Sequence, residues 1–207
     1  CNYQACAAPA PYLQEFSTGL LPIGVCAPNQ WAISQTSGDG WRFAGGGSFG
    51  TTPPGYNAAQ NGKALGTYAW IDFSGTDISP IMEVENVDAS NLTTPTLVFD
   101  YFSDFGTYGT VLTQIPNIMY VEYQDANGTW TLLDSLAVNV TGWNSYIYNL
   151  NPSQAASLKW RFRAESGGST YDYYNDLLLD DIRFMEAPVS GCDDPFADNY
   201  DPNATIN

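Results

Sequence analysis

The sequence predicts an all-β protein, a two-sheet antiparallel jelly-roll sandwich followed by a short irregular C-terminal linker module. Three observations predict it. Short runs rich in aromatic and β-branched residues alternate apolar with polar positions. Gly, Pro, Asn and Asp flank these runs. No long stretch shows the hydrophobic period of a helix, and a content of 44% hydrophobic residues is enough to fill a core.

The strand pattern recurs nine times along the chain, in runs that we expect to form one domain. The runs are residues 12–16, 30–34, 67–73, 96–102, 118–124, 129–136, 143–150, 158–165 and 177–185. Asn127-Gly128 separates the fifth run from the sixth and predicts a hairpin. So many short strands favour two packed sheets over a simple immunoglobulin domain. Residues 36–66, rich in Gly, Pro and Asn, are expected to form long loops, where binding usually takes place.

The charge balance excludes several classes of protein. Six Lys and Arg face 22 Asp and Glu, so the formal net charge of −16 argues against a nucleic-acid partner and against an anionic membrane surface. Excess carboxylate suits extracellular solubility and hard cations such as calcium. The absence of histidine removes the usual general base and most zinc sites, and leaves carboxylate-based catalysis open. No run of apolar residues is long enough to insert into a membrane.

The domain organisation is expected to have three parts. Residues 1–10 are predicted to end a preceding linker, residues 11–187 to form the sandwich, and residues 188–207 to begin an acidic, Cys-containing linker repeat. The Asn-Tyr pair of "CNY" at the start returns in "DNY" near the end, which fits modules separated by similar linkers. We therefore expect the chain to be a mature or excised piece of a longer product.

The tail "GCDDPFADNYDPNATIN" resembles a short acidic repeat of large surface proteins, of the gliding-adhesin type, in gliding bacteria that use type IX secretion. The resemblance covers residues 191–205 and implies a secreted, cell-surface protein. In that repeat a second Cys normally closes a disulfide. Here the closing Cys is absent, so the resemblance implies that the partner of Cys192 lies beyond Asn207.

The body of the chain resembles the MAM domain, a jelly-roll module of extracellular adhesion proteins, and its bacterial relatives. The matching stretches are "YLQEF", "GTYAWIDFSG", "LTTPTLVFDYFSDF", "MYVEYQDANGTWTLL" and "LLLDDIRF". The family's Asp-His-Thr stretch and most of its cysteines are missing, which places the chain nearer the bacterial relatives. The resemblance also implies that residues 78–92 form a loop.

A calcium site is predicted at the last strand. Strict alternation places Leu178, Asp180, Ile182 and Phe184 on one face, and a carboxylate buried there needs a partner or a metal. We expect calcium held by Asp180 and by Glu15 of the first strand, because the terminal strands of such sandwiches lie side by side. Further predicted ligands are Asp39 and Asp72. The alternative is that Asp180 pairs with Arg161, Arg163 or a tyrosine hydroxyl.

Three further sets of residues are assigned from the sequence. Cys6 and Cys26 flank the first strand and are predicted to form a disulfide, whereas Cys1 belongs to a linker or, alternatively, is lipidated. Ser135 in "DSL" resembles the O-glycosylation acceptor of the same bacterial group. Loop aromatics suit stacking on sugars or packing on a partner protein, although they would equally plug the ends of the sandwich. The predicted ligand-binding residues are Trp41, Tyr56, Tyr171 and Tyr173.

These observations predict a non-catalytic, calcium-stabilised adhesion or structural repeat of a large secreted surface protein. Its expected partners are a glycan or protein on a surface and neighbouring copies of the same module. One alternative is a carbohydrate-binding module of a secreted enzyme. The other is a glycan hydrolase that uses Glu83 and Asp88, because "EVENVD" is similar to the acidic strand of jelly-roll glucan hydrolases; its acids stand in the wrong order, which disfavours catalysis.

Overall fold

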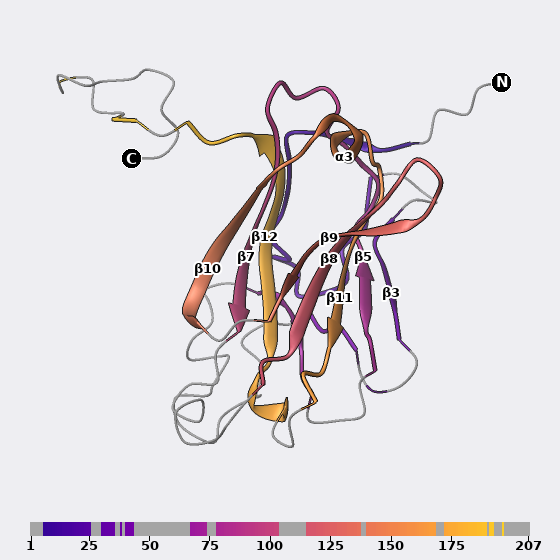
Figure 1. The fold of residues 1–207 in the computed structure, drawn as a ribbon, viewed down its shortest axis with the longest axis vertical. Helices are drawn as coiled ribbons and strands as arrows, with labels where there is room; N and C mark the ends of the chain where they lie inside the picture. The colour runs from indigo at the N-terminus through magenta and orange to yellow at the C-terminus, as the bar shows by residue number, and fades with distance from the viewer. Residues whose placement is uncertain are drawn as a thin grey trace.

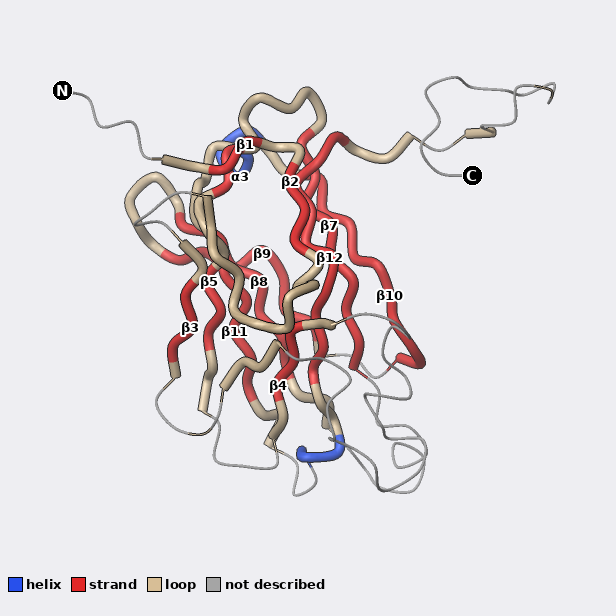
Figure 2. The backbone as a smooth tube through the Cα atoms, turned by 180° about the vertical axis from the view of Figure 1, so that it is seen from behind, coloured by secondary structure: helices blue, strands red, loops and turns tan. Residues whose placement is uncertain are grey.

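The chain is an all-β, two-sheet antiparallel sandwich of jelly-roll type, which confirms the predicted fold class (Figures 1 and 2). The structure is a computed structural model. It describes residues 6–25, 30–35, 38, 40–43, 67–73, 78–103, 115–137, 140–168, 172–189, 191–192 and 196. Among these residues, no helix is long and apolar enough to cross a membrane.

Each large sheet has five strands. Sheet I has the order β10-β7-β12-β2, with β4 also paired to β12. Its strands are β10 (Val140–Asn149), β7 (Pro95–Ser103), β12 (Leu177–Glu186), β2 (Tyr12–Gln14) and β4 (Ala69–Ile71). Sheet II has the order β3-β5-β11-β8-β9. Its strands are β3 (Ala32–Ser34), β5 (Ile81–Glu83), β11 (Trp160–Glu165), β8 (Ile118–Gln124) and β9 (Trp130–Leu136).

Every predicted run contains an observed strand, because the alternation of apolar and polar residues is a local signal. The prediction of a loop over residues 78–92 is wrong, since β5 is a central strand of sheet II and β6 (Val87–Asp88) pairs with β1 (Ala8–Pro9). Met82 and Val84 are buried and supply the apolar positions of this segment. Acidic residues between these apolar positions make the strand pattern difficult to recognise in the sequence.

The core lies between the two sheets and is largely aromatic. Phe99 of β7 meets Phe162 of β11 edge to face at 5.2 Å between ring centroids, and Trp160 packs against Phe184 at 5.4 Å. All four side chains are at most 2% exposed. Full burial of a large apolar side chain contributes about 1.5–3 kcal/mol, so these contacts between the sheets are a principal stabilising term. Trp160 belongs to this main core, whereas Trp70 belongs to a second buried cluster.

A β-bulge divides β12 into two segments that face opposite ways. Leu177 and Leu179 lie in the main core with Ile182, whereas Leu178 lies in the second cluster, on the outer side of sheet I. The register with β7 shifts between Asp180 and Arg183, and Asp181 has a φ of 51°. The prediction that one strict alternation runs through this strand is therefore wrong. Asp180 shares the outer face with Leu178, not the core face with Ile182.

The chain enters and leaves the sandwich at the same end. β2 pairs antiparallel with β12, which confirms that the opening and closing strands are neighbours. Ala8 and Ala10 are buried and bond through their N–H groups to the carbonyls of Asn86 and Asp88. The predicted domain start at residue 11 therefore falls after the first strand. Figure 1 shows the end of β12 at the same end of the sandwich as α3 (Pro152–Ala155), and Figure 2 shows β1 at this end as well.

Candidate functional site

The outer face of sheet II carries the candidate site. Along β11, Trp160, Phe162 and Ala164 are buried in the core, so the residues between them point outward. The register places Arg161 opposite Glu122 of β8 and Arg163 opposite Tyr120. Trp130 of β9 lies beside them. We call these outward residues the arginine strip: Tyr120, Glu122, Trp130, Arg161, Arg163 and Glu165.

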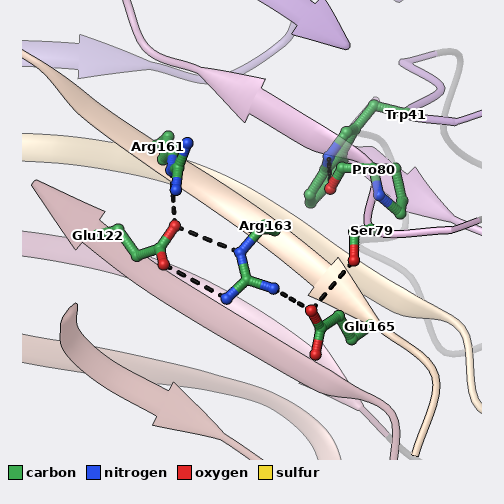
Figure 3. A network of polar contacts seen from close by, with 7 residues as sticks. All are labelled: Trp41, Ser79, Pro80, Glu122, Arg161, Arg163 and Glu165. Carbon is green, nitrogen blue, oxygen red and sulfur yellow. Dashed lines mark hydrogen bonds and ion pairs between the residues drawn. The ribbon is translucent and has the colours of Figure 1, made fainter. Parts of the chain in front are cut away.

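One carboxylate joins the two arginines of the strip (Figure 3). Arg161 Nε donates to Glu122 Oε2 at 2.6 Å, and Arg163 Nη2 lies 3.3 Å from Glu122 Oε1. Arg163 also pairs with Glu165, which accepts from the Ser79 hydroxyl at 3.0 Å. Burial alone would lower the pKa of Arg163, but the hydrogen bonds and charges of Glu122 and Glu165 outweigh it and raise the pKa. Arg163 is therefore held charged, and Glu122 fixes the positions of both arginines.

Each guanidinium of the strip lies over an aromatic ring. Arg161 Cζ is 4.2 Å from the ring centroid of Trp130, and Arg163 Cζ is 4.1 Å from that of Tyr120. Such cation–π contacts contribute about 0.5–1 kcal/mol at partly exposed positions. Burial and the nearby Glu165 charge raise the pKa of Tyr120, so its hydroxyl stays protonated. The result is a row of flat and charged groups along the outer face of sheet II.

A pocket of about 540 Å³ lies at one end of this face. It is formed by the β8–β9 turn, the connection between β5 and β6, and the segment that runs from α3 to β11. We call it the end pocket. Its lining residues are Asn86, Tyr123, Gln124, Asp125, Ala126, Ser153, Ala156, Ser157, Leu158 and Lys159. Its volume falls within the range of roughly 300–1,000 Å³ that is typical of small-molecule sites.

The predicted calcium ligands do not converge in the part of the chain that is described. Glu15 is exposed beyond the end of β2, whereas Asp180 is 3% exposed on the outer face of sheet I. Asp72 is also buried, and its Oδ2 lies 3.5 Å from Arg42 Nη1, a cation that would repel a metal ion. Asp39 lies outside the described residues. Those residues contain no group of three or more His, Cys, Asp or Glu that could hold a metal, so calcium stays a prediction.

The predicted ligand-binding aromatics are only partly placed. Trp41 is 3% exposed and its indole N–H donates to the carbonyl of Pro80 at 3.3 Å, which fits the alternative that loop aromatics plug the sandwich, and its ligand-binding role stays a prediction. Phe16 and Trp31 lie in the same core cluster as Trp41. A Gly-rich sequence beside an aromatic residue therefore does not by itself indicate that the side chain is exposed. Tyr173 is half-buried in the short 3₁₀ helix Asp172–Tyr174. Tyr56 and Tyr171 lie outside the described residues.

The remaining assigned residues have these positions. Cys6 is disulfide-bonded, but Cys26 lies outside the described residues, so their pairing stays a prediction. Cys192 is a free thiol. Ser135 is exposed on β9, and its N–H donates to Asp134 Oδ1 at 2.8 Å.

The acids of the hydrolase hypothesis engage separate partners. Glu83 lies opposite Arg161 on β5. Asp88 accepts hydrogen bonds from the backbone N–H and the hydroxyl of Ser90. Glu85 is buried and accepts from the Tyr12 hydroxyl at 2.9 Å and from the Val25 N–H at 2.7 Å. Hydrogen bonds therefore engage Glu85 and Asp88 at different places in the fold.

The arginine strip was missed in the sequence, although part of its signal is present. Alternation along "WRFRAE" and along the predicted hairpin places Arg161, Arg163, Glu122 and Trp130 on outward positions. The pairing of β11 with β8 joins strands far apart in the chain, and no local pattern specifies it. Arg161 and Arg163 were considered as partners for Asp180, but they pair with Glu122 and Glu165.

Several solved domains have a strand arrangement similar to that of this chain. The chain is similar to the xylan-binding CBM22-2 domain of Paenibacillus barcinonensis Xyn10C, with 14% identity over 86% of this chain and 100% of that one and a TM-score of 0.46. It is also similar to a family 6 carbohydrate-binding module, with 10% identity, 87% and 98% coverage and a TM-score of 0.44. The C-terminal family 22 module of Clostridium thermocellum Xyn10B has 11% identity, 85% and 92% coverage and a TM-score of 0.43.

At these identities and TM-scores the likeness describes the strand arrangement alone. No family model matches the chain. No curated protein matches it either. Two resemblances therefore stay predictions: that of the body to the MAM domain, and that of the tail to the bacterial linker repeat.

Proposed function

We propose that the chain is a non-catalytic, extracellular glycan-binding module whose ligand lies along the arginine strip. The observation that carries this proposal is the stacked geometry of the strip, in which Arg161 covers Trp130 and Arg163 covers Tyr120 while Glu122 holds both arginines. Flat side chains suit the apolar faces of sugar rings, and fixed guanidinium and carboxylate groups suit pairs of hydroxyls.

The charge of the strip favours a neutral glycan. Arg161 and Arg163 supply two positive charges, whereas Glu83, Glu122 and Glu165 beside them supply three negative charges. No surplus positive charge is left to attract an acidic polysaccharide, and the chain as a whole carries −16. Hydrogen bonding and stacking would then provide the affinity.

An adhesive role on a cell surface is the second candidate, and the placement of the chain ends favours it. Because β1 and the end of β12 lie at the same end of the sandwich, tethers on both sides would leave the outer face of sheet II free (Figures 1 and 2). The disulfide bond of Cys6 fits an oxidising, extracellular compartment. We propose a display module of a larger surface protein, with neighbouring copies along the same chain and with glycan binding as its activity.

Affinity electrophoresis tests the proposal with two matched variants. Leu132, opposite Glu122 on the outer face of sheet II, and Ile147, on sheet I, are both 51% exposed. Leu132→Asp should remove retardation of the protein in gels containing neutral soluble polysaccharides such as xylan or β-glucan, whereas Ile147→Asp should leave it unchanged. Polygalacturonate in the gel should retard neither. Equal retardation of both variants, or binding to polygalacturonate alone, would contradict the proposal.

A further inference from the structure

The arginine strip leads to the end pocket, because Gln124 and Lys159, which line the pocket, are the next outward residues along the segments that carry Glu122 and Arg161. Gln124 follows Glu122 on the outer side of β8, and Lys159 precedes Arg161 on the same side. The backbone N–H of Gln124 donates to the carbonyl of Lys159 at 3.0 Å, which holds the two segments together. From this continuity we propose that the module recognises the end of a glycan chain. The terminal sugar enters the end pocket, and the following sugars lie along the strip. This proposal rests on the proposed function above.

The end pocket presents the polar groups that a terminal sugar needs. Asn86, which lines the pocket, supplies an amide and is only 5% exposed. Lys159 also lines the pocket, is exposed, and its ammonium forms no ion pair within the described part of the chain. Ser153 adds a hydroxyl, and Tyr123 and Leu158 add apolar surface. Amide, hydroxyl and ammonium groups beside an apolar wall fit a neutral, hydroxyl-rich ring.

The walls of the pocket are fixed by hydrogen bonds and are therefore formed before a ligand arrives. The Ser157 hydroxyl donates to the carbonyl of Gln124 at 2.8 Å. In α3, Asn151 caps the helix and forms a capping box with Gln154, which positions Ser153. A preformed pocket avoids the entropy loss of ordering side chains on binding.

Backbone hydrogen bonds hold the segments that line the pocket. The N–H of Val87 donates to the carbonyl of Leu158 at 3.1 Å, and the N–H of Ala8 donates to the carbonyl of Asn86 at 2.8 Å. These bonds fasten β1, β6 and the segment before β11 to one another, so Asn86 and Leu158 keep fixed positions beside the pocket. A pocket at the end of the strip suits a terminal ring, whereas a simple lateral groove would be open at both ends.

The stoichiometry of binding distinguishes the two modes. Isothermal titration calorimetry with xylo- and cello-oligosaccharides of increasing length, and with the corresponding soluble polymers, counts the modules bound per chain. Binding of a chain end predicts one module per chain at every length. A number of bound modules that increases with chain length would overturn the proposal while leaving glycan binding intact. Reduction of the chains with borohydride would then tell which end is bound.

Two variants test the pocket itself. Ala156 is exposed at its rim in an ordinary helical conformation, so Ala156→Trp should fill the pocket and weaken oligosaccharide binding about tenfold or more. Lys159→Met keeps the side-chain stem and should weaken binding less. Ala137→Trp, at an exposed position outside the pocket, is the matched control and should change nothing. If Leu132→Asp abolishes binding and Ala156→Trp does not, the pocket proposal fails alone. If no glycan binds the unaltered protein, the proposed function fails with it.

Discussion

At the scale of single residues, the fold depends on a few buried polar groups that are fully engaged. Tyr12 connects three parts of the chain, since its hydroxyl donates to Glu85 Oε1 at 2.9 Å and accepts from the indole N–H of Trp31 at 3.1 Å. Burial, with the neighbouring Glu85 carboxylate, raises the pKa of Tyr12 far above its ordinary value. The hydroxyl therefore stays protonated and can donate to the buried carboxylate.

Removal of that hydroxyl is expected to destabilise the sandwich. Tyr12→Phe leaves Glu85 and Trp31 each without one hydrogen-bond partner, which should lower the free energy of unfolding by about 1–3 kcal/mol. Urea denaturation followed by tryptophan fluorescence measures this change. Ser135→Ala, at an exposed hydroxyl, is the control and should change the stability little. Equal stabilities of the two variants would show that the Tyr12 network is dispensable.

Glu186 introduces a pH-dependent contact where the chain leaves the sandwich. Its carboxylate accepts from the N–H groups of Thr93 and Thr94 and from the Thr94 hydroxyl, and these bonds hold its pKa below the ordinary value of 4.5. A lowered pKa in the folded state means that the contact stabilises the protein above pH 4.5. The stabilisation is then lost as the pH falls through the folded-state pKa.

Glu186→Gln should therefore melt at a lower temperature than the unaltered protein at neutral pH. The difference between the two should shrink as the pH falls below 4.5. Thermal melting across a pH series measures this. A difference that stays constant down to the most acidic pH would mean that the carboxylate is not the stabilising group.

At the scale of elements, the local alternation of apolar and polar residues predicts the strands. It does not predict features that depend on contacts between segments far apart in the sequence. The bulge at Asp180 and Asp181 reverses the faces of β12, and it depends on how β7 pairs with that strand. β5 was missed because Glu83 and Glu85 interrupt a short apolar run. The arginine strip depends on the pairing of β8 with β11, which no short-range signal specifies. The hairpin between β8 and β9 was predicted because Asn127-Gly128 acts locally.

The hairpin turn gives a test at this scale. Gly128 has a φ of 82°, and a Cβ built there meets no heavy atom within 4 Å. Gly128→Ala should therefore destabilise the protein by about 1–2 kcal/mol through backbone strain alone. Gly128→Asn should lose less, because Asn tolerates this conformation better. Chemical denaturation measures both. If Ala were tolerated as well as Asn, the positive φ would not be required for the turn.

At the scale of the whole molecule, the chain ends are fastened to one short segment. Residues 86–94 bond to the first strand through Asn86 and Asp88, and Asn91 Nδ2 donates to the carbonyl of Ala10 at 3.0 Å. The same segment bonds to Glu186 through Thr93 and Thr94. The first strand and the end of β12 therefore lie at one end of the sandwich. In the display role proposed above, this placement would keep the arginine strip accessible.

The predicted calcium site is the feature at this scale whose ligands do not come together among the described residues. If an ion binds the folded chain, thermal melting in calcium should exceed melting in EDTA by several degrees, because a ligand of the native state stabilises it by mass action. Asp180→Asn should then remove the difference. Asp125→Asn, in the hairpin turn, serves as a control of equal charge change and should keep it. Identical melting curves in calcium and EDTA would show that no calcium ion stabilises the folded chain.

The most direct measurement is NMR mapping of a bound neutral oligosaccharide on the isotopically labelled chain. We expect the side-chain signals of Trp130, Arg161 and Arg163 and the backbone amides of β8, β9 and β11 to shift together as the sugar is added. Signals from the outer face of sheet I, including Ile147, should stay in place. Shifts confined to sheet I or to the 3₁₀ helix at Asp172–Tyr174, with an unchanged arginine strip, would contradict the assignment of the site.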